Sequence, residues 1–280
     1  MLERTSRRNR CGSCLHSTLL EDIHMTTTKR AIVEQTTKFI ASVELPPLDT
    51  TQPYRYNPDA SVFQDDASGA AVNAGSLVSF VSGLTAQHKS DVLNSTLFAQ
   101  LAANKQYDRY KQTQKWYDSY VSVLAQVGWV VPAFAYREYT PSGGSFTVDA
   151  AVLDILAAIA TGDEMKILQT ALGGLKDNTK NEHALTLFDQ QSFPEKLGTF
   201  QIFPVGEDDG QLVMALAAME FKAVKHVTRF LWFTWTSTET QLFQSSQKGV
   251  LNEDVYGPVR KVIIDKLGDR AKQFIIDIEI

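Results

Sequence analysis

Cysteine is nearly missing from this chain: its 280 residues include two, Cys11 and Cys14, both close to the N-terminus. From Met25 onward there is none, so disulfides, a thiol nucleophile and a cysteine-rich zinc site are excluded for the body of the protein. The pair has the C-x-x-C spacing that can hold a metal or carry redox chemistry. A single pair, without a second one or a thioredoxin-like βαβ pattern, is a weak signal for either role.

Positive charge is also in short supply. Lysine and arginine number 27 against 32 aspartates and glutamates, which gives a net charge of −5. Proteins that bind nucleic acid by neutralising phosphates carry an excess of cations, and the longest basic cluster here is the short run at residues 4–10. We therefore expect no nucleic-acid partner.

Long apolar runs are missing as well. The best of them, residues 120–136, contains Gln126 and Pro132 and is too short to cross a bilayer comfortably. The first 24 residues lack the apolar core of a signal peptide. We expect synthesis in the cytoplasm as a soluble protein, with any release following a route without an N-terminal Sec signal.

The first 24 residues differ from the rest in being rich in arginine and in holding both cysteines. Met25 and the Thr-Thr-Thr-Lys-Arg run after it resemble a fresh start. The residues just before Met25 can be encoded with a GGAGGA sequence, which resembles a bacterial ribosome-binding site. We interpret residues 1–24 as an untranslated or disordered leader and residues 25–280 as a single compact domain.

Motifs for catalysis are absent. The body contains three histidines, His88, His183 and His226, and none has a metal-ligand spacing. No G-x-S-x-G elbow occurs, and the glycine-containing run at 68–76 has neither the Rossmann spacing nor a Walker lysine. The acidic residues near 59–66 and 207–209 do not fit the EF-hand pattern, so we expect no metal site and no cofactor.

Helical spacing of apolar residues dominates the first two thirds of the chain. It predicts helices around 32–43, 77–84, 93–101 and 116–127, and a helical hairpin over 147–175. In the hairpin, Gly162 is expected to end the first helix and Asp163 to cap the second.

From Gly198 the period of the pattern changes to two. Apolar runs on either side of the GEDDG sequence at 206–210 predict a β-hairpin, and Pro132 marks 129–139 as an edge strand. Asn252 or Pro258 opens a further helix. The chain then alternates to its end, which predicts a last strand that turns Ile276, Ile278 and Ile280 to the core.

The run from Thr228 to Ser246 reads as a strand in which aromatic residues give way to serine, threonine and glutamine. Trp232 and Trp235 then fall on opposite faces. Aromatic rings beside hydroxyl side chains are typical of lipid- or carbohydrate-binding surfaces, although they also occur in cores. Nearby His226 and Arg229 suit an anion contact, with a solvated turn as the alternative.

The fold class that these patterns favour is α+β: a helical N-terminal half packed on a mainly antiparallel sheet from the C-terminal half, closing with a helix and a strand. For function they favour a non-enzymatic bacterial protein, toxin- or virulence-factor-like, that binds a membrane lipid or a host surface glycan. Its binding residues would be Trp232, Trp235, His226 and Arg229. The alternatives are an enzyme with a site assembled around His226 and a structural or assembly protein.

Overall fold

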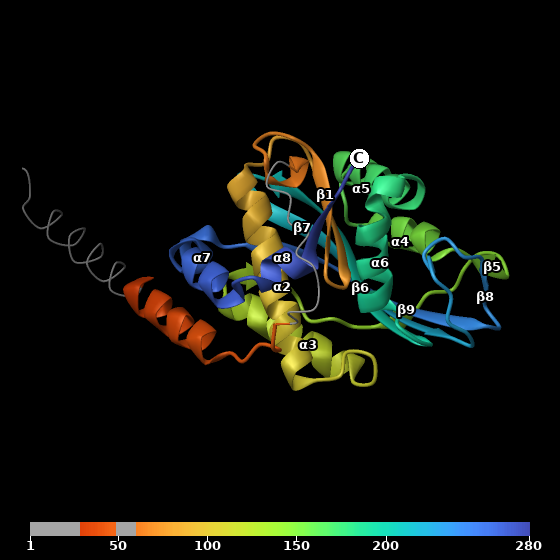
Figure 1. Ribbon diagram of the computed structural model, residues 1–280, viewed down its shortest axis with the longest axis horizontal. Helices are drawn as coiled ribbons and strands as arrows, with labels where there is room; N and C mark the ends of the chain where they lie inside the picture. The colour runs from red at the N-terminus through yellow and green to blue at the C-terminus, as the bar shows by residue number, and fades with distance from the viewer. Residues whose placement is uncertain (1–28, 49–59) are drawn as a thin grey trace, which may run out of the picture.

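The computed structural model describes residues 29–48 and 60–280, so the expected leader, residues 1–24, lies outside the described part. A mixed sheet forms the centre of the protein, and helices pack on both of its faces (Figure 1). The predicted α+β class is confirmed. The arrangement differs from the expectation in one respect, since helices from the middle of the chain cover the second face.

The main sheet has the strand order β10-β1-β2-β6-β7-β9-β3, and β4 pairs with β9 beside β3. Strands β2 and β6 run parallel, whereas the other neighbouring pairs of described strands are antiparallel. A separate two-stranded sheet joins β5 and β8. The bounds are β1 Gly69–Asn73, β2 Ser76–Phe80, β3 Trp129–Val130, β4 Arg137–Glu138, β5 Ser145–Phe146, β6 Leu197–Asp208, β7 Gln211–Ala223, β8 Trp235–Thr236, β9 Thr240–Leu251 and β10 Ile275–Ile278.

One face of the sheet is covered by α2 and α3 together with α7, and the other by α4, α5 and α6 (Figure 1). Residues 29–42 form a further helix, which packs on the first of these cores through Ile40. The bounds are α2 Ala86–Gln106, α3 Thr113–Gln126, α4 Val148–Leu156, α5 Gly162–Asp177, α6 Glu182–Ser192, α7 Glu253–Leu267 and α8 Arg270–Phe274, with short 3₁₀ turns η1 at Ser61–Phe63 and η2 at Thr179–Asn181.

The helix predicted around 77–84 is wrong, because residues 76–80 form strand β2. All five of its residues are buried; Leu77 belongs to one core and Val78 to the other. A strand that is covered on both faces shows no alternation of apolar and polar residues. Its apolar positions then resemble a short helical stripe.

The helical hairpin is confirmed, but the start of α5 differs from the prediction. Thr161, rather than Asp163, is the N-cap: its Oγ1 accepts from the N–H of Glu164, and the Glu164 carboxylate accepts from the N–H of Thr161 at 2.6 Å. This is a capping box, in which each side chain satisfies a free backbone donor of the other residue. Gly162 is therefore the first helical residue and not the end of the preceding helix.

The last strand is confirmed, but the predicted burial of its side chains holds fully for Ile278 alone, since Ile276 is partly buried and Ile280 is exposed. Ile275 and Ile278 are 5% and 1% exposed and belong to opposite cores, whereas Ile280 is 42% exposed. Asn181 holds the segment after β10 by accepting from the N–H of Glu279 at 2.9 Å and donating to its carbonyl at 3.0 Å. One side-chain amide thus replaces a neighbouring strand there.

The predicted β-hairpin, the edge strand and the helix after β9 are also found. The hairpin of β6 and β7 turns at Asp209 and Gly210, both with positive φ. Asn252 caps α7, and Pro258 lies inside that helix. The predicted edge strand over 129–139 is present as the two short strands β3 and β4, which pair with β9.

Candidate functional site

The aromatic run does not form the long strand that its sequence predicts. Residues 224–234 make an irregular path between β7 and the short strand β8, and β9 begins at Thr240. We call residues 224–239 the aromatic connection. Its large side chains divide into two sets. The buried set fixes the connection to the core, and the second set, which we call the exposed set, is at least partly exposed.

The buried set consists of Phe230, Leu231 and Trp235. Phe230 stacks on Phe188 of α6 at a centroid distance of 6.0 Å. The indole N–H of Trp235 donates to the carbonyl of Phe230 at 3.0 Å, which closes the path on itself. Trp235 is therefore a core residue and not a binding residue, so its assignment as part of a contact surface does not agree with its position.

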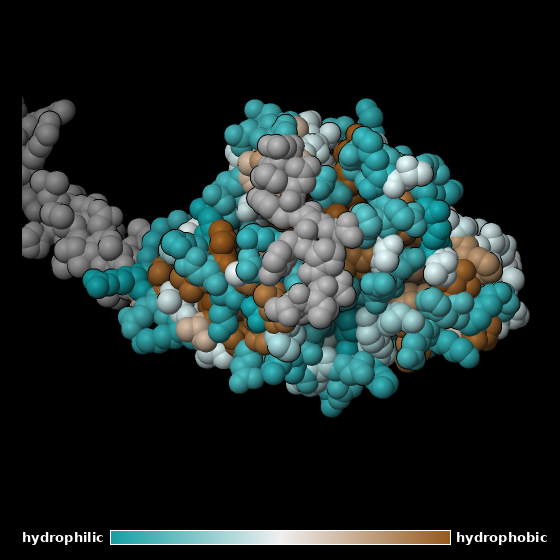
Figure 2. Space-filling view, viewed as in Figure 1, coloured by the Kyte–Doolittle hydropathy of each residue, from teal (hydrophilic) through white to brown (hydrophobic). Residues whose placement is uncertain are grey.

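The exposed set consists of Val224, Val227, Trp232 and Phe233. Val224 is 56% exposed, whereas the other three are partly buried and also pack against the core under α4, α5 and α6. The ammonium of Lys225 lies 4.9 Å from the ring centroid of Phe233. The short strands β5 and β8 lie at the right of Figure 1, and Figure 2 shows hydrophobic residues among hydrophilic ones at that end of the molecule.

His226 is exposed and stacks on the buried ring of Phe193 at 5.5 Å. It also lines a surface groove of about 730 Å³ together with Tyr110, Lys111 and Lys196. The histidine is thus at the surface, as a solvated turn would place it, and the groove beside it is lined by both cations and carboxylates, since Asp108 and Glu195 line it too.

Arg229 has a left-handed backbone, with φ of 57°. Its N–H donates to the Oδ2 of Asp189 on α6 at 2.6 Å, and its guanidinium donates to the carbonyl of Lys176 near the end of α5 at 2.8 Å. A non-glycine residue in this conformation costs free energy, which the surrounding contacts must offset. Arg229 thereby joins the aromatic connection to two helices.

Asp189 is the residue of this site that sequence reasoning missed. Burial raises the pKa of its carboxyl to about 6, against the opposing effects of the Arg229 N–H and of the charges on Arg229 and His226. Within the described part of the chain its Oδ1 is buried without a hydrogen-bond partner. Asp189 lies in a helix that the pattern did not predict, so no signal in the sequence marked it.

The structure brings His226, Arg229 and Asp189 together and places Trp232 farther along the same connection. The charge of His226 acts to lower the pKa of Asp189, although burial outweighs it. No hydrogen bond joins them among the contacts of the described residues. Asp189 and Arg229 therefore attach the aromatic connection to the helices. Asp189 and His226 do not form an aligned acid–base pair.

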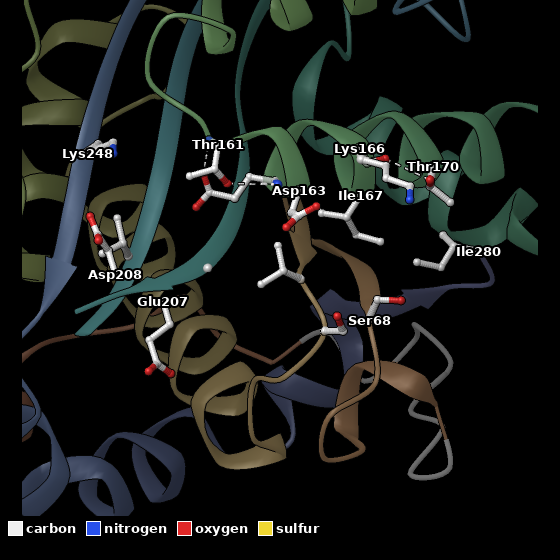
Figure 3. Close-up of a pocket in the computed structure, with 15 residues that line it drawn as sticks. Ser68, Thr161, Asp163, Lys166, Ile167, Thr170, Glu207, Asp208, Lys248 and Ile280 are labelled. Atoms are coloured by element: carbon white, nitrogen blue, oxygen red, sulfur yellow. Dashed lines mark hydrogen bonds between the residues drawn. The ribbon is translucent and has the colours of Figure 1, made fainter. Parts of the chain in front are cut away.

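A second hollow, of about 640 Å³, lies beside the start of α5 (Figure 3). Asp163 and Lys166 of α5 line it, as do Glu207 of β6 and Lys248 of β9. Figure 3 shows these side chains spread along the hollow rather than gathered at one point. The capping box engages the amides of Thr161 and Glu164, and the charged side chains do not converge, so the hollow favours no particular chemistry.

The described residues contain neither a cluster of metal ligands nor a helix that could span a membrane. Residues 29–48 and 60–280 contain no group of three or more histidine, cysteine, aspartate or glutamate side chains placed to hold a metal ion. In the same part of the chain no helix has the length and apolarity needed to cross a bilayer.

Comparison with known proteins adds little. No family model matches this chain, and no curated protein matches it. A solved structure of the Evf virulence factor is 10% identical, with 85% of this chain and 88% of that chain covered and a TM-score of 0.33. A delta-endotoxin structure is 11% identical, with 74% and 90% covered and a TM-score of 0.33. At these values neither likeness carries an argument about function.

Proposed function

We propose that this protein binds a lipid membrane surface through the exposed set of the aromatic connection, as a non-enzymatic bacterial toxin or virulence factor would. The observation that carries the proposal is the pairing of partly exposed rings at Trp232 and Phe233 with a buried anchor at Phe230 and Trp235. Rings held in this way are already ordered before they reach an interface. Little of the binding free energy is therefore spent on ordering them.

The chemistry of the surrounding side chains supports a lipid interface. Tryptophan is amphipathic and prefers the boundary between water and acyl chains. The ammonium of Lys225, at 4.9 Å from the ring of Phe233, is placed beside the inserting group. Lys225 pairs with Glu239 at 3.7 Å in the free protein, and by exchanging that carboxylate for a headgroup phosphate it could hold the protein at the interface while the ring enters the apolar layer. Val224 adds apolar area at the same end of the molecule.

The test is co-sedimentation with phosphatidylcholine vesicles, with and without phosphatidylserine, and a titration of tryptophan fluorescence. Each fully inserted apolar side chain contributes about 1.5–3 kcal/mol. Trp232→Ala and Phe233→Ala are therefore expected to lower vesicle affinity by about tenfold each. Val130→Ala is the matched control, because Val130 is 65% exposed but lies on β3, away from the connection.

Two outcomes contradict the proposal. The first is wild-type protein that binds neither vesicle composition, and the second is a loss of binding that Val130→Ala shares with Trp232→Ala. A third outcome is a wild-type protein that does not bind vesicles but binds host glycans on an array. If Trp232→Ala abolishes that glycan binding, the partner of the exposed set is a glycan.

The alternative is an enzyme with a site around His226, and one observation favours it. The carboxyl group of Asp189, with a pKa of about 6, lies near His226. His226 in turn lines a groove of about 730 Å³. General acid–base catalysis uses groups with pKa values close to neutrality. Activity on a panel of ester, glycoside and phosphoester substrates that His226→Ala abolishes would establish this alternative.

A further inference from the structure

The contact between Asp189 and Arg229 is one of several attachments of residues 224–234 to the helices beneath them, beside the stacking of Phe230 on Phe188 and the hydrogen bond from the Asp149 N–H to the Leu231 carbonyl at 3.0 Å. The Arg229 N–H donates to Oδ2 at 2.6 Å, and the left-handed backbone of Arg229 keeps that N–H directed at the carboxyl. The guanidinium holds the end of α5 through the Lys176 carbonyl. The left-handed conformation of Arg229 is intrinsically unfavourable for a residue with a side chain. Without the Asp189 contact, Arg229 would therefore tend to leave this conformation.

The carboxyl of Asp189 occupies a position that suits its neutral form. Oδ1 is buried and accepts no hydrogen bond from the described residues. The charged and titratable groups that face it are Arg229 and His226 on the connection and Glu182 on its own helix. Although both cations favour the carboxylate, burial outweighs them. A charged carboxylate is most costly where one of its oxygens has neither water nor a donor.

We propose that Asp189 is a latch that holds the aromatic connection to α6 more tightly at acidic pH than at neutral pH. When the connection is attached, the carboxyl is shielded from water; when it lifts away, both oxygens are hydrated. The proton therefore binds more strongly in the attached state. By linkage, acidification favours the attached state and deprotonation favours release.

The consequence for binding rests on the proposed function. The proposed function keeps Phe230 and Trp235 buried while the rings contact lipid; if insertion also requires the connection to lift from α6, vesicle affinity falls on acidification in step with the latch. The latch itself concerns only the free protein and is measured without lipid. Failure of vesicle binding therefore leaves the latch standing, and failure of the latch leaves vesicle binding standing.

Hydrogen exchange followed by mass spectrometry tests the latch. Protection of amides in residues 224–234, corrected for the intrinsic effect of pH on exchange, is expected to rise about tenfold between pH 7.5 and pH 5. Peptides from β6 and β7 provide an internal reference, since they report on the body of the sheet. Asp189→Asn, which is neutral at every pH, is expected to show high protection at both pH values.

Asp265→Asn is the matched control, because Asp265 is an exposed aspartate of α7 that pairs with Lys261. It should retain the full pH dependence. The proposal is overturned if protection of residues 224–234 is the same at both pH values or falls on acidification. It is equally overturned if Asp189→Asn keeps the wild-type dependence. Should Asp189→Asn fail to fold, the wild-type profile against the β6 and β7 reference decides alone.

Discussion

The guanidinium of Arg109 lies directly against Gly75: a Cβ added to this glycine would come within 2.5 Å of both terminal nitrogens of the arginine. The same group lies 4.5 Å from the ring centroid of Trp116 and donates to the carbonyl of Thr199 at 2.9 Å. Arg109 is 4% exposed, and within the described residues it has no ion pair. Its Nε and Nη1 also lack hydrogen-bond partners there. A buried cation is thus packed between a strand turn and α3.

This packing predicts that Gly75→Ala destabilises the protein through Arg109. The new methyl group would displace the flexible end of the Arg109 side chain, so we expect a cost near the lower end of the range of about 1–3 kcal/mol for overpacking. In an Arg109→Met background the flexible methionine can move aside, so the same substitution should cost less than half as much. Urea unfolding of the two single variants and the double variant measures the coupling.

Gly257→Ala is the control for that cycle. Gly257 lies within α7, and nothing approaches a Cβ built there within 4 Å. Alanine should stabilise this helix by about 0.5–1 kcal/mol. If Gly75→Ala costs the same unfolding free energy in the wild-type and Arg109→Met backgrounds, then contact with Arg109 is not the reason that position 75 requires glycine.

The two tryptophans of the aromatic connection should respond differently to truncation. Trp235 is fully buried against Phe221 and Phe193, so Trp235→Ala is expected to cost about 3–5 kcal/mol of unfolding free energy. Trp232 is half-buried at the surface, and Trp232→Ala should cost about 1 kcal/mol or less. Thermal and urea unfolding compare them. Similar losses for both would make Trp232 a core residue and remove the basis of the lipid-binding proposal.

These two residues also show where sequence reasoning stopped. Alternation placed Trp232 and Trp235 on opposite sides of a strand, but it could not reveal that the backbone between them is irregular. The path is set by long-range contacts, such as that between Phe230 and Phe188, which leave no periodic signal. In contrast, the turn at Asp209 and Gly210 carries its own local chemistry, so the hairpin of β6 and β7 was predictable.

The same distinction explains the candidate site. His226 and Arg229 were identifiable because they are charged residues in a short basic stretch. Asp189 was not, because its role depends on burial by segments far away in the sequence. Strand β2 was missed for a related reason: with Leu77 in one core and Val78 in the other, the period of two is hidden.

The ion pair between α2 and α7 gives a third prediction. Arg260 donates to both carboxylate oxygens of Asp91, at 2.7 and 2.6 Å, and the Asp91 side chain is 1% exposed. Burial raises the pKa of Asp91 despite the arginine. Arg260→Met leaves that charge buried and unpaired, and it should cost about 3–5 kcal/mol at neutral pH. The loss should shrink on acidification as Asp91 becomes protonated.

Lys261→Met serves as the control for this pair. Lys261 is the next residue and pairs with Asp265 at the surface, with side chains 83% and 62% exposed. Its removal should change unfolding free energy by less than about 0.5 kcal/mol. A small effect of Arg260→Met at every pH would indicate that Asp91 finds another partner.

The last prediction concerns the pH dependence of global stability. The pKa of Asp189 is about 6 in the native state, above its ordinary value of 3.8, so between these values the native state binds more protons at this site than the unfolded state. Stability contributed by this residue is therefore present at low pH and lost as pH rises through about 4 to 6. Asp189→Asn removes the titration, so its unfolding free energy should improve relative to wild type as pH increases over that range. Urea unfolding at pH 4, 5, 6 and 7 measures the difference. A constant difference would mean that Asp189 does not titrate in this window, and a falling one would mean that the Arg229 N–H and the nearby cations outweigh burial.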